Sequence, residues 1–260
     1  MPIGAQMFTL REHCKTVDDA AKSLERVKAM GYDGIQASAA IFNSVDPADV
    51  KALKRALDDN GLVCGATHEG LLKIESDDDV KAIVEKHQIL DCKLTAIGGF
   101  NPGADDWTRQ NWLDFIKKYN DLAARFAESG LRIGYHNHSH ELAPLDDGST
   151  PAQMLVDGLD ESIWFEWDVY WLAHGLADPV EWVNKVAGRI PAVHYKDGTP
   201  NAKREHVMWS IGTGNLNWPK INDACKAAGV EWYLVERDSG PEDPFDSLEK
   251  SAKTLRGWGL

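Results

Sequence analysis

The chain is poor in cysteine and lacks any long apolar run. Its four cysteines, Cys14, Cys64, Cys92 and Cys225, lie far apart in the 260-residue sequence, so none belongs to the close pairs that build zinc knuckles or redox motifs. We expect them to be buried single thiols. No basic stretch followed by an apolar one opens the chain, and no apolar run approaches membrane-spanning length. These absences argue against a membrane span and predict a location in the reducing cytoplasm.

Positive charge is also scarce. Lysine and arginine number 28 against 41 aspartates and glutamates, which gives a formal net charge of −13. Such a surface has no general attraction for nucleic acid or for an anionic membrane. We therefore expect a small molecule as the partner, with neither nucleic acid nor membrane bound.

What the chain does have is a regular alternation of short apolar runs and amphipathic segments. Between the runs, apolar residues three or four apart, such as Leu53 and Leu57, predict helices. Eight strand and helix units in one series predict a single domain over residues 1–260 with a (β/α)8 TIM barrel fold. The eight runs suited to strands buried on both faces are Ile3 to Phe8, Gly34 to Ala37, Leu62 to Thr67, Leu94 to Gly98, Arg132 to His136, Trp164 to Asp168, Ala192 to Lys196 and Tyr233 to Glu236.

Capping residues stand where these helices should begin and end. A capping side chain precedes a proline in Asp46-Pro47, Thr150-Pro151, Asp178-Pro179 and Asp243-Pro244, and Ser76 with Asp79 resembles a capping box. Glycines that can end a helix in the left-handed conformation follow four helical stripes, at Gly31, Gly61, Gly130 and Gly229.

Four of the predicted strands run into ionisable residues at their carboxyl ends. The densest example follows Tyr135, where His136-Asn137-His138-Ser139-His140-Glu141 places three imidazoles and a carboxylate within six residues. Because parallel strands bring their carboxyl ends to one face of a barrel, Glu141, Asp168, His194 and Glu236 could meet there. Three carboxylates and one imidazole suit a divalent ion, with manganese or magnesium favoured and cobalt or zinc as alternatives.

The same strand ends carry a family resemblance. The segments concerned are Gly134-Tyr135-His136-Asn137-His138 with Glu141, Asp168-Val169-Tyr170-Trp171 with Gly175 and Asp178-Pro179, His194-Tyr195-Lys196-Asp197, and Gly212-Thr213-Gly214-Asn215-Leu216 before Val235-Glu236. On these segments the chain resembles the xylose isomerase-like TIM barrel superfamily, and within it the sugar phosphate isomerase/epimerase group. Members of this superfamily isomerise or epimerise keto sugars and inosose-like polyols, and some cleave or hydrate 3-keto-glycosides.

This resemblance implies one divalent metal ion held by Glu141, Asp168, His194 and Glu236. Related epimerases carry a glutamate on the fifth strand itself, whereas this strand ends in His136. Either Glu141 folds back from the following loop or His136 takes the place of the glutamate.

The expected reaction is removal of a proton next to a metal-bound carbonyl, which leads to isomerisation, epimerisation or elimination. The resemblance implies Glu236 and Glu141 as candidate bases, and His138 is a third candidate because it shares a strand face with His136. For substrate binding we expect His68, Glu69, His136, Trp171 and Lys196, with the amides of Gln6 and Gln36 as further hydroxyl ligands. The remaining histidines, which are His13, His87, His174 and His206, are predicted to lie on the surface or in loops.

Three other functions remain open at this point. The nearest is a metal-dependent lyase or hydratase acting on 3-keto-glycosides. A non-catalytic sugar-binding barrel is a second alternative. An abasic-site endonuclease shares this barrel, but it needs more histidine ligands and a basic groove, which the acidic composition disfavours. The sequence does not identify the substrate, and a homo-oligomer is only a possibility.

Overall fold

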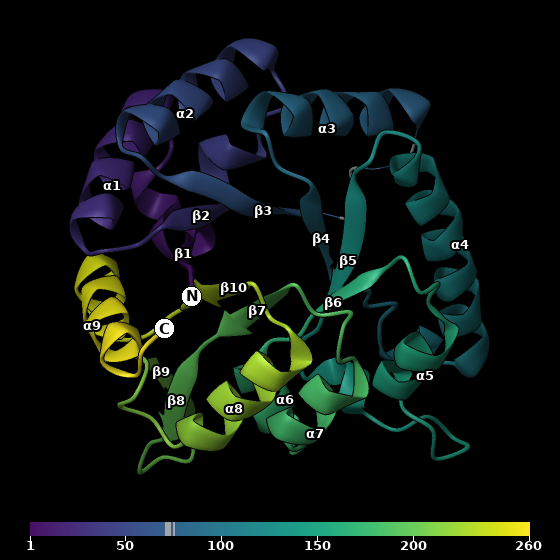
Figure 1. The fold of residues 1–260 in the computed structure, drawn as a ribbon. Helices are drawn as coiled ribbons and strands as arrows, with labels where there is room; N and C mark the ends of the chain where they lie inside the picture. The colour runs from purple at the N-terminus through teal and green to yellow at the C-terminus, as the bar shows by residue number, and fades with distance from the viewer. Residues whose placement is uncertain (71–73, 75) are drawn as a thin grey trace.

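In the computed structural model, which describes residues 1–70, 74 and 76–260, eight parallel strands form a barrel surrounded by helices (Figure 1). Neighbouring strands pair in the order β6-β5-β4-β3-β2-β1-β10-β7, and a bridge between Asp168 and His194 joins the two ends of the sheet. The fold is the predicted (β/α)8 barrel. The strands are β1 (Ile3–Gln6), β2 (Gly34–Ala37), β3 (Val63–Glu69), β4 (Leu94–Gly98), β5 (Arg132–His136), β6 (Trp164–Glu166), β7 (Ala192–Tyr195) and β10 (Trp232–Val235).

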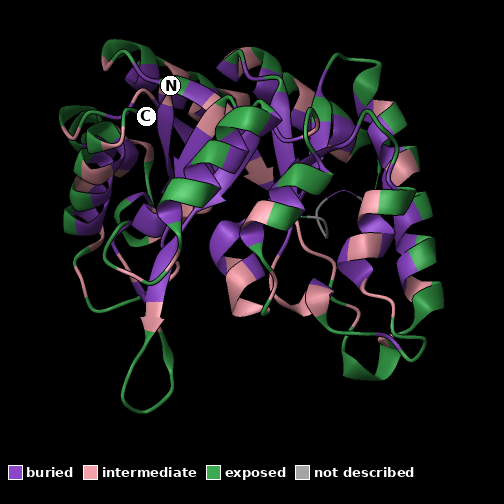
Figure 2. Ribbon diagram, turned by 60° about the horizontal axis from the view of Figure 1, so that its bottom comes forward, coloured by how far each residue is buried: buried purple, intermediate pink, exposed green. Residues whose placement is uncertain are grey.

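The helices pack around the barrel with their apolar faces inward, so that the exposed residues lie on the outer side (Figure 2). The predicted caps are present at the helix starts, including the capping box of Ser76 and Asp79. The predicted glycines at the helix ends have positive φ, for example 59° at Gly61 and 84° at Gly229. The α-helices are α1 (Val17–Ala29), α2 (Pro47–Asp59), α3 (Asp77–Leu90), α4 (Arg109–Ala127), α5 (Pro151–Gly158), α6 (Val169–His174), α7 (Pro179–Lys185), α8 (Trp218–Ala228) and α9 (Pro244–Gly257).

Two tryptophans fill part of the barrel interior. Trp164 of β6 is fully buried, and Trp232 of β10 packs against the same small cluster of apolar residues. A β-carbon on Gly134 would lie 2.3 Å from the Trp164 ring, and one on Gly65 would lie 2.5 Å from the Trp232 ring. The glycines therefore make room for the indoles, and this packed interior leaves the strand ends as the place for a binding site.

Some elements differ from the sequence prediction. The first strand ends at Gln6, because the Gln6 side chain accepts a hydrogen bond from the Phe8 backbone and a 3-10 helix, η1 (Met7–His13), begins there. A hairpin of β8 (Asp197–Pro200) and β9 (His206–Trp209) follows β7 and was not predicted. Its first strand reads Asp-Gly-Thr-Pro, which has no strand signature.

One histidine was wrongly predicted to lie on the surface or in a loop. His87 is 3% exposed within α3, where Nε2 lies 2.8 Å from Thr67 Oγ1 and Nδ1 lies 2.7 Å from the Ile83 carbonyl oxygen. Burial lowers its pKa to about 4. All four cysteines are free and buried, as expected. No helix in the described ranges has the length and apolarity needed to cross a membrane.

Candidate active site

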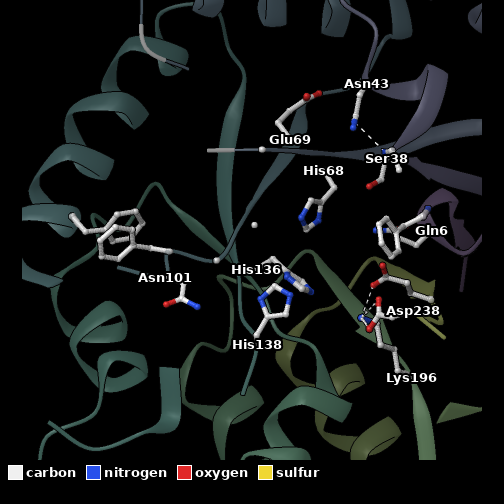
Figure 3. Close-up of a pocket in the computed structure, with 18 of the residues that line it drawn as sticks. Gln6, Ser38, Asn43, His68, Glu69, Asn101, His136, His138, Lys196 and Asp238 are labelled. Carbon is white, nitrogen blue, oxygen red and sulfur yellow. Dashed lines mark hydrogen bonds and ion pairs between the residues drawn. The ribbon is translucent and has the colours of Figure 1, made fainter. Parts of the chain in front are cut away.

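A cavity of about 930 Å³ opens at the carboxyl ends of the strands. Residues from several strand ends line it, among them His68, His136 and Lys196 (Figure 3). Glu236 lines it as well. The barrel thus brings polar residues that are far apart in sequence to one mouth, as the sequence analysis anticipated.

Four buried side chains converge at this cavity, and two of them, His136 and Glu236, line it. His136 ends β5, Asp168 follows β6, His194 lies in β7, and Glu236 follows β10. One potential ligand atom from each lies within 4.8 Å of the others, and all four residues are buried. The His194 Nδ1 atom is 2.9 Å from Glu236 Oε2 and 3.8 Å from Asp168 Oδ2, while His136 Nε2 is 3.6 Å from the same Asp168 oxygen.

Local structure aims the Asp168 carboxylate at this cluster. Its Oδ1 caps α6 by accepting hydrogen bonds of 3.0 Å from the Tyr170 and Trp171 backbone N–H groups. Its own N–H donates to Asn137 Oδ1 at 2.8 Å. With one oxygen committed to the helix start, the other faces His136 and His194.

The ligand atoms of the cluster make no regular hydrogen bonds within the described structure. Both ring nitrogens of His136, Nδ1 of His194, Oδ2 of Asp168 and Oε2 of Glu236 are buried without one, although ion-pair contacts join several of them. Buried polar atoms without partners are costly, and a bound cation would satisfy one ring nitrogen of His136 together with the atoms named from His194, Asp168 and Glu236. The four residues could therefore hold a divalent ion.

The two imidazoles of the cluster, His136 and His194, have pKa values that are shifted in opposite directions. Burial lowers the pKa of His136 well below its usual value, and the neighbouring His194 adds to this effect. For His194, burial also acts to lower the pKa, but the carboxylates of Glu166 and Glu236 outweigh it and raise the pKa well above its usual range. His136 is thus neutral and has one ring nitrogen with a free lone pair, which is the form that binds a metal.

Lys196 lies beside the same carboxylates. Its Nζ is 2.9 Å from Asp168 Oδ2 and 2.8 Å from Glu236 Oε2, and it donates hydrogen bonds to both oxygens of Asp238. Burial alone would lower the pKa of Lys196, but these carboxylates raise it above its usual value. The ammonium charge helps to hold the carboxylates together.

Glu166 is a further member of the site that was not predicted from the sequence. Its Oε1 accepts a hydrogen bond of 2.6 Å from Gln36 Nε2, and its Oε2 lies 3.1 Å from His194 Nε2. Burial opposes its ionisation, but His194 holds its pKa at about 2. The sequence did contain a signal for Glu166. It lies two residues before Asp168, and alternate residues of a strand share a face.

The structure does not bring Glu141 into the four-residue cluster. Its carboxylate accepts hydrogen bonds from the Tyr135 hydroxyl at 2.8 Å and from the His138 backbone N–H at 2.9 Å. Burial raises its pKa. Of the two fifth-strand alternatives, His136 is the residue in contact with Asp168, because Glu141 lies on the short 3-10 helix η5 (His140–Leu142) beyond the strand.

The predicted substrate-binding residues occupy different positions. His68 lines the cavity, with Nδ1 3.4 Å from Glu166 Oε2. Glu69 also lines it, but the carboxylate forms a buried ion pair of 2.7 Å with Lys86. Trp171 is not among the described lining residues, and its ring lies 5.6 Å from Lys196 Nζ.

His138 lines the cavity next to the cluster. Its ring centroid is 4.9 Å from that of His136. Burial lowers its pKa to about 4, with Lys196 as the second cause. His138 is therefore a neutral imidazole near pH 7, able to accept a proton at the edge of the cavity.

Two named proteins are similar to this chain in sequence. The rhizopine catabolism protein MocC of Rhizobium meliloti is 24% identical over 249 residues, which covers 84% of this chain and 74% of that protein. An inosose dehydratase of Geobacillus thermodenitrificans is 26% identical over 177 residues, and the match covers 58% of this chain and 55% of that protein.

Solved structures share the fold over nearly the whole chain. A sugar phosphate isomerase/epimerase of Parabacteroides distasonis superposes with a TM-score of 0.81 at 22% identity, covering 98% of this chain and 93% of that one. The family model described as xylose isomerase-like TIM barrel matches residues 24–258. The chain belongs to the xylose isomerase-like TIM barrel family.

Proposed function

We propose that this protein is a divalent-metal-dependent isomerase or epimerase of a keto sugar, sugar or polyol, built as one barrel domain. The observation that carries the proposal is that four buried side chains meet at a large cavity, namely His136, Asp168, His194 and Glu236. Ligand atoms that are buried without a regular hydrogen bond suit a cation. The family and the sugar-converting relatives support the same class of reaction.

The four cluster residues would hold the ion. Two imidazoles and two carboxylates form a donor set that accepts manganese, our first candidate, and also magnesium, cobalt or zinc. When bound, such an ion polarises a substrate carbonyl and makes the adjacent C–H more acidic. The ion's identity and Glu141's exclusion from the ligand set are parts of the proposal.

His138 is the proposed proton acceptor. It lines the cavity, and its pKa of about 4 leaves Nδ1 or Nε2 free to take a proton from a substrate carbon near neutral pH. The electron pair of the broken C–H bond stays in the substrate, and return of the proton to the neighbouring carbon or to the opposite face completes isomerisation or epimerisation. The Glu141 carboxylate accepts a hydrogen bond from the His138 backbone N–H, and Glu141 thereby acts as a positioning residue for His138.

Glu236 is the second candidate base, because it belongs both to the cluster and to the cavity wall. His68 and Lys196, which also line the cavity, would bind substrate hydroxyls. Trp171 and Glu69 remain proposed substrate contacts. Trp171 is not among the described residues that line the cavity, and the Glu69 carboxylate is paired with Lys86.

Dehydration is the second candidate function. The inosose dehydratase relative is 26% identical over its matched part. Elimination begins with the same proton removal, after which a leaving group departs from the next carbon in place of reprotonation. This is the lyase or hydratase alternative, with 3-keto-glycosides as the candidate substrates.

Proton exchange with solvent tests the proposal directly. The protein is loaded with manganese and incubated with keto sugars, inososes or 3-keto-glycosides in deuterated water, and deuterium in the recovered sugar is measured by mass spectrometry. We expect exchange in the unsubstituted protein and a loss of at least about a hundredfold in Glu236→Gln. Glu231→Gln, an exposed carboxylate just before β10, is the matched control. Full exchange in Glu236→Gln, or none with any keto sugar in the unsubstituted protein, would contradict the proposal.

Cellular location and assembly belong to the proposal as well. The four buried free thiols suit a reducing compartment, so we place the enzyme in the cytoplasm. We also propose a homo-oligomer, which size-exclusion chromatography with light scattering would test.

A further inference from the structure

The ammonium group of Lys196 is surrounded by carboxylates. Four carboxylate oxygens lie within 3.1 Å of Nζ, two from Asp238, one from Asp168 and one from Glu236. An ammonium has only three N–H groups. Lys196 therefore has more acceptors around it than it can serve, so a ligand that accepts from its ammonium group must compete with these carboxylates.

Asp238 is the outermost of these three carboxylates. Its side chain is 26% exposed, whereas those of Asp168 and Glu236 are 0% and 5% exposed. Asp238 and Lys196 both line the cavity and lie together at one end of it (Figure 3). Asp238 thus covers the side of Lys196 that an incoming substrate would meet.

Among the described residues, free positive charge is scarce around the rest of the cavity. Among the lining residues that the structure describes, the cationic side chains are Lys196 and Lys118, and Lys118 is exposed on α4. The carboxylates among them are Glu69, Asp114, Glu236 and Asp238. A phosphate or carboxylate on a substrate needs charge-assisted donors to replace its hydration, and these lining residues offer it no free buried donor of that kind.

We infer that Asp238 is a specificity-determining residue that reserves this site for uncharged polyhydroxy substrates and excludes phosphorylated or carboxylated ones. The inference rests on the proposed function, since it names the substrate class of the same site. The Asp238 carboxylate accepts hydrogen bonds from the Lys196 ammonium group, as an anionic substituent of a substrate would. An incoming anion must therefore either displace Asp238 or be repelled by it.

Binding of inorganic phosphate tests this role of Asp238. Calorimetric titrations compare the unsubstituted protein, Asp238→Ala and Asp114→Ala, each with magnesium and again after chelation, so that phosphate on a metal is separated from phosphate on Lys196. Asp114→Ala is the matched control, because it removes one carboxylate from the cavity wall that accepts a hydrogen bond from Gln110 and is not one of the three carboxylates around Lys196. We expect Asp238→Ala to bind phosphate at least about tenfold more tightly than the other two, and Lys196→Met in the Asp238→Ala background to abolish that gain.

Two results would overturn the inference. One is phosphate affinity in Asp238→Ala no greater than in Asp114→Ala, and the other is equally tight binding by the unsubstituted protein. Asp238→Asn, which removes the charge with little change of shape, replaces the alanine variant if circular dichroism shows that the latter is unfolded.

Turnover separates this inference from the proposed function. If the unsubstituted protein converts a ketose and its phosphate ester equally well, the proposed function stands and the role of Asp238 fails. If no neutral sugar is converted but Asp238→Ala still gains phosphate binding, the proposed function fails and Asp238 is confirmed as the residue that excludes anions.

Discussion

The Nε2 atom of His194 lies 3.1 Å from Oε2 of Glu166, on the opposite side of the ring from Glu236. Gln36 Oε1 is 2.6 Å from the same nitrogen. These contacts engage Nε2 and leave Nδ1 directed at Asp168 and Glu236. A carboxylate behind a histidine ligand in this way fixes the ring orientation and the tautomer that binds a metal.

Glu166→Gln should weaken divalent-ion binding by about 10- to 100-fold, because it removes the charge that orients His194. Titration calorimetry with manganese measures the change, and circular dichroism checks the fold. Glu161→Gln, the same substitution at an exposed position before β6, should leave ion affinity unchanged. Equal affinities in the two variants would show that Glu166 does not support the site.

His136→Ala and Glu141→Gln distinguish the two possible fifth-strand ligands. We expect elemental analysis to find about one ion per unsubstituted chain and in Glu141→Gln, and little in His136→Ala, because only His136 contacts Asp168. Loss of the ion from Glu141→Gln with retention in His136→Ala would reverse the assignment.

Gly134→Ala should destabilise the barrel. The added β-carbon would lie 2.3 Å from the fully buried Trp164 ring, so either the indole or the strand must move, at a cost of about 1–3 kcal/mol in the free energy of unfolding. Urea denaturation measures it. Gly257→Ala is the control, since nothing lies within 4 Å of its β-carbon position. Equal stability of the two variants would mean that the interior has spare room.

His87 should make stability depend on pH. Burial lowers its pKa to about 4 in the folded chain, whereas an unfolded histidine titrates near 6.5. Between these values the unfolded state binds the extra proton, so stability is lost as the pH falls through this window. From pH 7 to pH 5 the unfolding free energy should drop by about 2 kcal/mol more in the unsubstituted protein than in His87→Gln. Parallel pH profiles would contradict this assignment.

The sequence by itself determined the architecture. Strand positions, helix caps such as Asp46-Pro47, and the glycines that end helices are local signals, because period and capping depend on residues close in the chain. The polar strand ends also indicated that Asp168, His194 and Glu236 would meet, since the barrel places all carboxyl ends of its strands at one mouth.

Only the tertiary structure decided which side chains complete the site. Glu141 and His136 are five residues apart, and the choice between them depends on how the chain turns after β5 towards Tyr135. The contact of Glu166 with Gln36 spans 130 residues, and the carboxylates around Lys196 come from two different strand ends, those of β6 and β10. Such contacts exist only once the barrel closes, so no local pattern encodes them.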